Sequence, residues 1–236
     1  MLIINADDWG RSVAETDAAL RCYQSARITS VSAMVFMKDS ERAAELAKDH
    51  NIDTGLHLNF TEPFSGESNS ERLIESHRGI MQFLRSNKYA QLFYNPFLRK
   101  AFVYSCRAQL EEFVRLFGSL PSHIDGHHHM HLCGNILLSH AIPAGVRMRR
   151  SFSFWSGEKS TLNRAYRSLI DGWLGLRYRL SDYFFDLTQC LQEKKLSRVA
   201  TLARSYSVEL MTHTVDRTEA DYLMSEEFHH FLLQCA

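Results

Sequence analysis

The sequence contains no long apolar segment and no recognisable leader. No window offers the roughly 18 consecutive apolar residues of a membrane-spanning helix. The chain reaches Asp7 and Asp8 within its first 8 residues, which leaves no room for a basic start, an apolar core and a cleavage site. Together these absences predict a cytoplasmic protein without a membrane anchor.

Cysteine is sparse and unpaired in sequence. The five cysteines are odd in number, lie far apart and form no CxxC pair. This pattern is typical of reduced, mostly buried thiols rather than of a disulfide framework or a cysteine metal site.

The chain also has no excess of either charge. Lys plus Arg and Asp plus Glu both number 27, which argues against wholesale nucleic-acid binding. No repeat, low-complexity tract or linker divides the 236 residues. We therefore expect one domain over residues 1–236, since barrels of this length are usually single domains.

Short apolar runs alternate with helical patterns along the chain. This order predicts parallel βαβ units and an α/β fold with a barrel-like sheet. Residues 61–95 are less regular, and we interpret them as an insertion over the rim of the site. Residues 152–183 are basic, aromatic and only partly helical by pattern. The expected strands are 2–4, 28–36, 52–60, 123–131 running into a loop, 146–148 and 208–212, and the expected helices are 12–25, 39–50, 96–117, 135–144, 189–204 and 219–234.

Aspartate and histidine residues lie at the carboxyl ends of four of the predicted strands. They are the pair Asp7-Asp8, the single His57, the cluster 123–131 and His213. In parallel α/β folds the active site lies at the carboxyl ends of the strands. Carboxylate and imidazole groups from separate strands are typical ligands of a catalytic divalent metal with open coordination positions.

The segment HIDGHHHMH, residues 123–131, is the most specific of these signals. On a strand, alternate residues would share one face. A helical interpretation would pair the first and last histidines of the HHHMH stretch, but no glutamate follows the first and Gly126 disfavours a helix. The alternating set comprises His123, Asp125, His127, His129 and His131.

Four motifs together resemble one known family. NADDWG at 5–10, GLHLN at 55–59, HIDGHHHMH at 123–131 and MTH at 211–213 are similar to the motifs of the YdjC-like carbohydrate deacetylases. The family includes chito-oligosaccharide and hopanoid-pathway deacetylases. The resemblance implies a distorted (β/α) barrel, one divalent metal ion and hydrolysis of an N-acetyl group.

The resemblance also implies a ligand set. Carried over residue by residue, the metal ligands are Asp8, His57 and His127. One carboxylate and two imidazoles suit Zn²⁺ by ligand softness, whereas the family leaves Mg²⁺ open. Both ions remain candidates.

The remaining polar residues receive roles around that metal. Asp7 is placed to take the proton of the attacking water. His213, or another histidine of the cluster, is a candidate to protonate the leaving amine. Asp125 is expected to orient a ligand histidine. Arg147 falls on an arginine of the family and is expected to hold Asp7 ionised or to bind substrate. His123, His129 and His131 are expected to support the ligands or the substrate.

Two other functions remain open from the sequence. One is a different metallohydrolase, such as a phosphoesterase on a similar barrel, although no second metal cluster is evident. The other is an inactive homologue that binds a glycan without turnover. The expected substrate is an N-acetylated sugar, free or linked to phosphate or lipid.

Residues 145–180 combine arginines with aromatic residues. The plain interpretation is an amphipathic surface. The alternative is contact with a sugar phosphate or, peripherally, with an anionic membrane. Self-association into a homo-oligomer is a further possibility.

Overall fold

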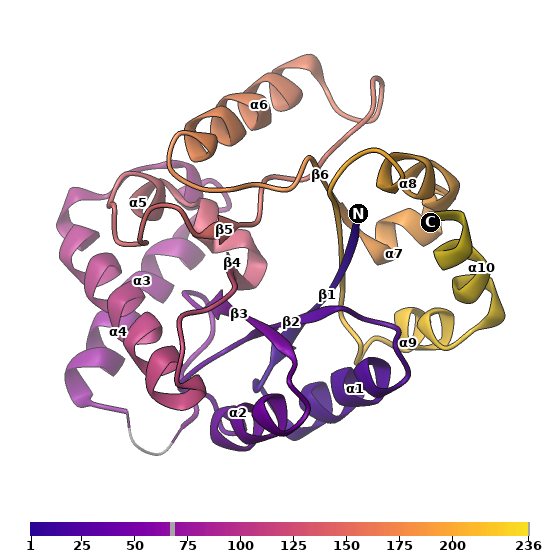
Figure 1. The fold of residues 1–236 in the computed structure, drawn as a ribbon. Helices are drawn as coiled ribbons and strands as arrows, with labels where there is room; N and C mark the ends of the chain where they lie inside the picture. The colour runs from indigo at the N-terminus through magenta and orange to yellow at the C-terminus, as the bar shows by residue number, and fades with distance from the viewer. Residues whose placement is uncertain (67–68, 236) are drawn as a thin grey trace.

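A curved parallel sheet surrounded by helices forms the protein (Figure 1). The structure, a computed structural model, describes residues 1–66 and 69–235. Within these ranges the sheet has seven strands. They are β1 (Leu2–Trp9), β2 (Ser30–Ala33), β3 (Asp53–Leu58), β4 (His123–Gly126), β5 (Arg147–Met148), β6 (Tyr183–Asp186) and β7 (Val208–Thr212).

Helices connect the strands and cover the outside of the sheet (Figure 1). Ser12 caps the first helix by accepting a hydrogen bond from the backbone of Ala14. The helices are α1 (Val13–Gln24), α2 (Ser40–Asp49), α3 (Glu71–Ser86), α4 (Arg99–Phe117), α5 (Gly134–Leu137), α6 (Thr161–Gly175), α7 (Leu187–Gln192), α8 (Leu196–Ala203), α9 (Arg217–Leu223) and α10 (Glu226–Cys235), with short 3-10 turns η1 (Ala90–Leu92), η2 (Pro96–Leu98) and η3 (His127–Leu132).

The strand order makes the sheet a distorted barrel. The order is β5-β4-β3-β2-β1-β7-β6, and every pairing is parallel. A few backbone hydrogen bonds join the two edges: the N–H of Met148 donates to Arg179 O at 2.9 Å, and that of Ser153 donates to Phe184 O at 2.9 Å. The predicted α/β fold with a barrel-like parallel sheet is confirmed, and only isolated bonds, not a continuous ladder, connect the segments beside its two edge strands.

Several predicted elements differ in extent. The strand expected through His131 ends at Gly126, and the helix expected over 135–144 ends at Leu137. The helices expected over 189–204 and 219–234 are each broken in two, at 193–195 and 224–225. The strand β6 was not predicted separately because Tyr183–Asp186 lies at the end of the basic, aromatic segment that hides its pattern.

The segment 61–95 contains more regular structure than its composition suggests. The 16-residue helix α3 occupies its middle and packs against α4. Residues 67 and 68 of the segment lie outside the described residues. The start of the segment, Thr61 and Glu62, contacts the histidines that follow β4. This contact supports the interpretation as a rim insertion, which remains a prediction.

Two chemical expectations about the chain concern thiols and membrane spans. The five cysteines are free, and four of them are buried, as predicted. Among the helices of the described residues, none combines the length and apolarity that a membrane crossing needs.

Gly55 on β3 gives a test of the packing inside the barrel. A Cβ at this position would lie 2.4 Å from the ring of His123, which is buried and 2.9 Å from Ser32 Oγ. We expect Gly55→Ala to lower the free energy of unfolding by about 1–3 kcal/mol, the usual effect of overpacking a tight interior. Urea unfolding followed by tryptophan fluorescence measures it.

The matched control is Gly172→Ala. Gly172 is exposed in the middle of α6, and a Cβ there meets no neighbour within 4 Å. This change should leave stability equal or raise it by up to about 1 kcal/mol, because alanine favours the helix. Equal stability of the Gly55→Ala variant and the wild type would contradict the packing described here.

Candidate active site

A β-bulge at the end of β1 directs two consecutive carboxylates into one pocket. The pairing of β1 with β2 shifts register between Ala6 and Trp9, and Asp8 has a left-handed backbone, φ 66°. Asp7 and Asp8 are both buried and both line the pocket, whereas adjacent residues of a regular strand point to opposite faces. Left-handed backbone is costly for a residue other than glycine, and such strain tends to occur at functional sites.

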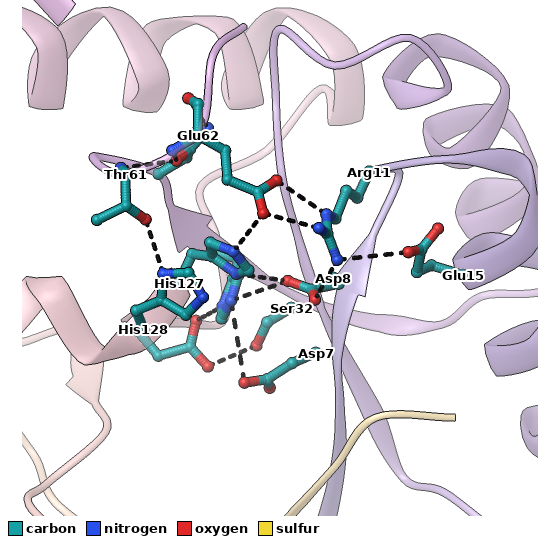
Figure 2. Close-up of polar contacts among 12 residues, drawn as sticks. Asp7, Asp8, Arg11, Glu15, Ser32, Thr61, Glu62, His127 and His128 are labelled. Atoms are coloured by element: carbon teal, nitrogen blue, oxygen red, sulfur yellow. Dashed lines mark hydrogen bonds and ion pairs between the residues drawn. The ribbon is translucent and has the colours of Figure 1, made fainter. Parts of the chain in front are cut away.

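Asp8 meets two imidazoles from neighbouring strands (Figure 2). Its Oδ1 lies 2.9 Å from Nδ1 of His127 and 3.3 Å from Nε2 of His57. The parallel register brings them together, because His57 ends β3 and His127 follows β4. The three residues predicted as metal ligands therefore form one buried group.

The turn after β4 differs from the prediction. The alternation expected over residues 123–131 holds only for His123 and Asp125. The chain then enters η3, in which His128 and His129 have left-handed backbones, φ 53° and 58°. Gly126 permits this turn, because a Cβ there would lie 2.9 Å from the backbone N of His131. The prediction of one shared face was wrong because a single tight turn re-aims the last histidines.

The donor set of Asp8, His57 and His127 fits a divalent cation. Asp8 Oδ1 is buried and accepts no hydrogen bond of normal geometry from any described residue, although two imidazole nitrogens face it. Ligand atoms about 2.0–2.1 Å from a shared ion lie about 3 Å apart, for octahedral and tetrahedral geometry alike. The measured separations of 2.9 and 3.3 Å match that spacing.

A buried arginine organises the carboxylates behind this group. The Arg149 guanidinium donates to both oxygens of Asp7 at 2.7 Å and to Glu209 Oε1 at 2.6 Å. It also lies 2.6 Å from Asp125 Oδ2. One guanidinium thus faces three carboxylates, and Asp8 adds a fourth nearby. The site carries a surplus of buried negative charge, which a bound cation would offset.

The arginine beside Asp7 is Arg149, not Arg147 as expected from the sequence. Arg147 pairs in register with His123 and lies 2.9 Å from its Nδ1 and 3.7 Å from Asp53. Arg147 lies on β5, and Arg149 directly follows this strand, on the same side by alternation. Arg149 is two residues closer to the carboxyl end, however, and so comes level with Asp125. The arginine selected from the sequence therefore lies two residues before the one that contacts Asp7.

Asp125 and His57 form the next contact outward. Asp125 Oδ1 lies 2.8 Å from His57 Nδ1, and Asp125 Oδ2 accepts a hydrogen bond from Ser32 Oγ at 2.8 Å. Asp125 therefore fixes the imidazole so that its Nε2 faces Asp8. This is the orienting contact expected of Asp125.

The other histidines of the cluster lie in different surroundings. His123 is below the site, between Ser32 and Arg147, and His131 packs under the turn with its Nε2 3.1 Å from Arg149 O. Burial lowers the pKa of each to about 4, so both stay neutral near pH 7. His129 reaches the pocket, and its ring packs edge-on against Phe152.

Neighbouring charges shift the titration of the central groups. Burial alone would lower the pKa of His57, but Asp125 and Asp7 raise it to about 10. Burial alone would raise the pKa of Asp8, yet His127 and His57 hold it well below its usual range. Asp125 is likewise kept ionised, by Arg149 and His57 against the effect of burial.

The site opens into a cavity of about 460 Å³. His213, directly after β7, lines this cavity together with Asp7, Asp8, His57, His127 and His129. The backbone N–H of His213 donates to Glu219 Oε2 at 2.6 Å, so the buried Glu219 fixes the loop that carries the histidine. The structure thus brings together six of the residues selected from the sequence.

Glu62 and Arg11 are site residues that the sequence analysis missed. Glu62 Oε1 lies 3.2 Å from His127 Nε2, and Arg11 forms a bidentate pair with Glu62 at 2.7 and 2.9 Å (Figure 2). Asp186, at the end of β6, also lines the cavity. The position of Asp186 after a strand was a usable signal, but the strand itself went unrecognised.

The fold and site define a parallel α/β barrel protein whose buried polar site lies at the carboxyl ends of its strands. A model of the YdjC-like protein family matches residues 1–234. The chain therefore belongs to the YdjC-like family, as its motifs predicted.

Named relatives of this chain are carbohydrate deacetylases. A mouse carbohydrate deacetylase is 28% identical over 90% of this chain and 77% of its own length. A chitooligosaccharide deacetylase from Proteus mirabilis is 32% identical, over 56% of this chain and 50% of its own length. Among solved structures, a provisionally named cellobiose-phosphate cleavage protein from Enterococcus faecalis superposes with a TM-score of 0.67 at 18% identity, over 99% of this chain and 94% of that one. This last likeness concerns the fold alone.

Replacing Arg149 tests the charge arrangement. Arg149→Met would leave Asp7, Asp125 and Glu209 buried without their cation, and we expect a loss of about 3–5 kcal/mol in the free energy of unfolding at pH 7. Because Arg149 depresses the pKa of Asp125, the wild type loses this stabilisation as the pH falls below about 4, and the deficit of the variant should shrink there. Urea unfolding at several pH values measures both effects.

Arg147→Met is the matched control. This arginine is half-buried and 3.7 Å from the exposed Asp53, so its loss should cost no more than about 1 kcal/mol. If the two variants were equally stable, Arg149 would not be the organising cation.

Proposed function

We propose that this protein is a metal-dependent hydrolase that removes an N-acetyl group from an amino sugar. The observation that carries the proposal is the buried group of Asp8, His57 and His127 beside a second carboxylate, Asp7, in one cavity. Membership of the YdjC-like family and the names of its relatives support the carbohydrate substrate.

Asp8, His57 and His127 would hold the ion, with Asp125 orienting His57. A divalent cation in this position supplies acidification of water and polarisation of the acetamide carbonyl. One carboxylate and two imidazoles suit Zn²⁺ by ligand softness, and Mg²⁺ remains a candidate from the family resemblance.

Asp7 serves as the general base. Its Oδ1 already accepts hydrogen bonds from Asn5 and Arg149, whereas Oδ2 accepts one from Arg149 and lies 3.9 Å from His57 Nε2. Oδ2 is therefore the oxygen with capacity for the proton of the attacking water. Arg149 fixes the carboxylate in position through a hydrogen bond to each of its oxygens.

His213 serves as the general acid. Its ring lines the same cavity, and the loop that carries it is held by Glu219. As the amide C–N bond breaks, the leaving nitrogen takes a proton and departs as the amine, while the acetyl group leaves as acetate. The imidazolium form of a histidine that faces the cavity can donate that proton and is left as neutral imidazole.

The substrate class extends to phosphate- or lipid-linked amino sugars. Arg167 is half-buried and lines a second cavity, which adjoins the active-site cavity. It has no carboxylate partner within 4 Å among the described residues and is a candidate to bind an anionic group of the substrate. A cytoplasmic setting suits the free thiols.

Acetate release tests the function directly. We expect the purified protein to release acetate from N-acetylated oligosaccharides, nucleotide sugars or lipid-linked sugars, to lose this activity with a chelator, and to regain it with Zn²⁺ or Mg²⁺. Release of phosphate from phosphate esters without release of acetate would instead indicate a phosphoesterase. Sugar binding without either product would indicate an inactive glycan-binding homologue.

The ligand assignment predicts loss of metal on substitution. His57→Ala and His127→Ala should each bind less than about a tenth of the wild-type metal, since each removes one of three protein ligands. Elemental analysis of the purified, folded variants measures the occupancy. His229→Ala, at an exposed position on α10, is the control and should retain full occupancy. Full occupancy in both ligand variants would disprove the assignment.

The two aspartates should give different phenotypes. Asp8→Asn should weaken metal binding, because it removes the carboxylate charge between the two imidazoles. Asp7→Asn should keep the metal and the KM but lower kcat by roughly 10²–10⁴-fold, the usual effect of losing a general base. Metal analysis with steady-state kinetics separates the two. The reverse pattern would exchange the roles, and near-normal turnover of both variants would refute the mechanism.

A further inference from the structure

Helix α6 presents its more apolar side to solvent. Ile170 and Leu174 are buried against the barrel, and Asp171 pairs with Arg150 at 2.7 Å. Five large apolar side chains remain exposed at alternating spacings of four and three residues, which places them on one stripe of the helix and its C-cap. They are Leu162 (82% exposed), Tyr166 (43%), Leu169 (69%), Trp173 (44%) and Leu176 (78%).

This apolar stripe stands away from the rest of the molecule. Figure 1 shows α6 as the outermost element at the top of the view, outside the ring formed by the other helices. A helix that buries few side chains against its own domain while exposing three leucines and a tryptophan has an unused apolar face, and such faces commonly mark interaction sites.

The charge around the stripe is positive. In residues 145–180 the only carboxylates are Glu158 and Asp171, and these pair with Lys195 and Arg150. The cations Lys159, Arg164 and Arg179 are exposed and have no carboxylate within 4 Å among the described residues. The surface therefore combines unpaired positive charge with exposed leucine and tryptophan.

A cavity links this surface to the active site. It has a volume of about 470 Å³ and shares His128, His129 and Phe152 with the active-site pocket. Tyr166 of the stripe lines one side of the cavity. Tyr89 and Leu92, both about half exposed, line it as well. The stripe thus borders a cavity that adjoins the active site.

We infer that the α6 stripe docks on the surface of an anionic lipid membrane. Exposed leucine and tryptophan suit the boundary between headgroups and acyl chains, and nearby lysine and arginine are attracted to anionic lipids. Docking would place the 470 Å³ cavity beside the membrane surface. The docking itself does not depend on the proposed deacetylation.

A second copy of the chain fits the same surface less well. The helix is about 22 Å long at 1.5 Å per residue, and a face about 10 Å wide provides only a few hundred Å². A stable protein–protein interface buries about 800 Å² on each partner. Pairing two copies of this face would also bring the positively charged side chains of both copies close together, where they repel one another.

Vesicle co-sedimentation tests the inference. The wild-type protein should sediment with vesicles of phosphatidylglycerol and phosphatidylcholine, should bind pure phosphatidylcholine at least about fivefold more weakly, and should be released by salt. The triple variant L162S/L169S/L176S should bind the anionic vesicles at least about tenfold more weakly, because it removes the apolar groups that would insert. R164Q/R179Q should weaken binding to anionic vesicles alone.

The matched control is L120S/M224S/L233S, which changes three exposed apolar residues elsewhere and should bind as the wild type does. Urea unfolding confirms that all variants are folded. Failure of the wild type to sediment, or equal binding by the stripe variant, would overturn the inference. Equal binding to neutral and anionic vesicles would overturn the anionic part. A dimer that the stripe variant abolishes, without vesicle binding, would assign the surface to self-association instead.

Discussion

The buried guanidinium of Arg149 is the interaction on which the site depends. It contacts Asp7, Asp125 and Glu209, which come from β1, β4 and β7. One cation therefore ties three strands together inside the barrel. Without it, the interior would contain adjacent carboxylates with no compensating charge, an arrangement that costs several kcal/mol.

Each contact outward from Arg149 fixes the next. Asp125, held on one oxygen by Arg149, orients His57 with the other, and His57 then faces Asp8. The bulge in β1 allows Asp7 to face the guanidinium while Asp8 faces the imidazoles. Two neighbouring carboxylates consequently occupy different electrostatic surroundings, which is the basis for giving them different roles.

Residues at the rim of the barrel shape the opening of the active site. Glu62, from the segment after β3, closes one side of His127, and the left-handed turn at His128 and His129 opens the pocket toward the second cavity. The edge of the barrel between β5 and β6 is joined by only a few backbone bonds, and the chain there extends outward as α6. The part of the sheet with the fewest pairing bonds thus lies next to the helix that carries the exposed apolar stripe.

The sequence by itself determined the fold class and the central residues. Apolar runs alternating with helical patterns predicted the parallel sheet, and the carboxyl ends of its strands marked the aspartate and histidine clusters as candidates. The choice of Asp8, His57 and His127 among them came from the resemblance to the YdjC-like family, and the structure brings the three together. The tertiary structure alone decided that Arg149 rather than Arg147 meets Asp7. Sequence alternation cannot distinguish positions two apart on one strand face, whereas the pairing register with β4 does. Contacts such as that of Glu62 with His127 depend on how a long loop packs, and that packing has no local pattern in the chain.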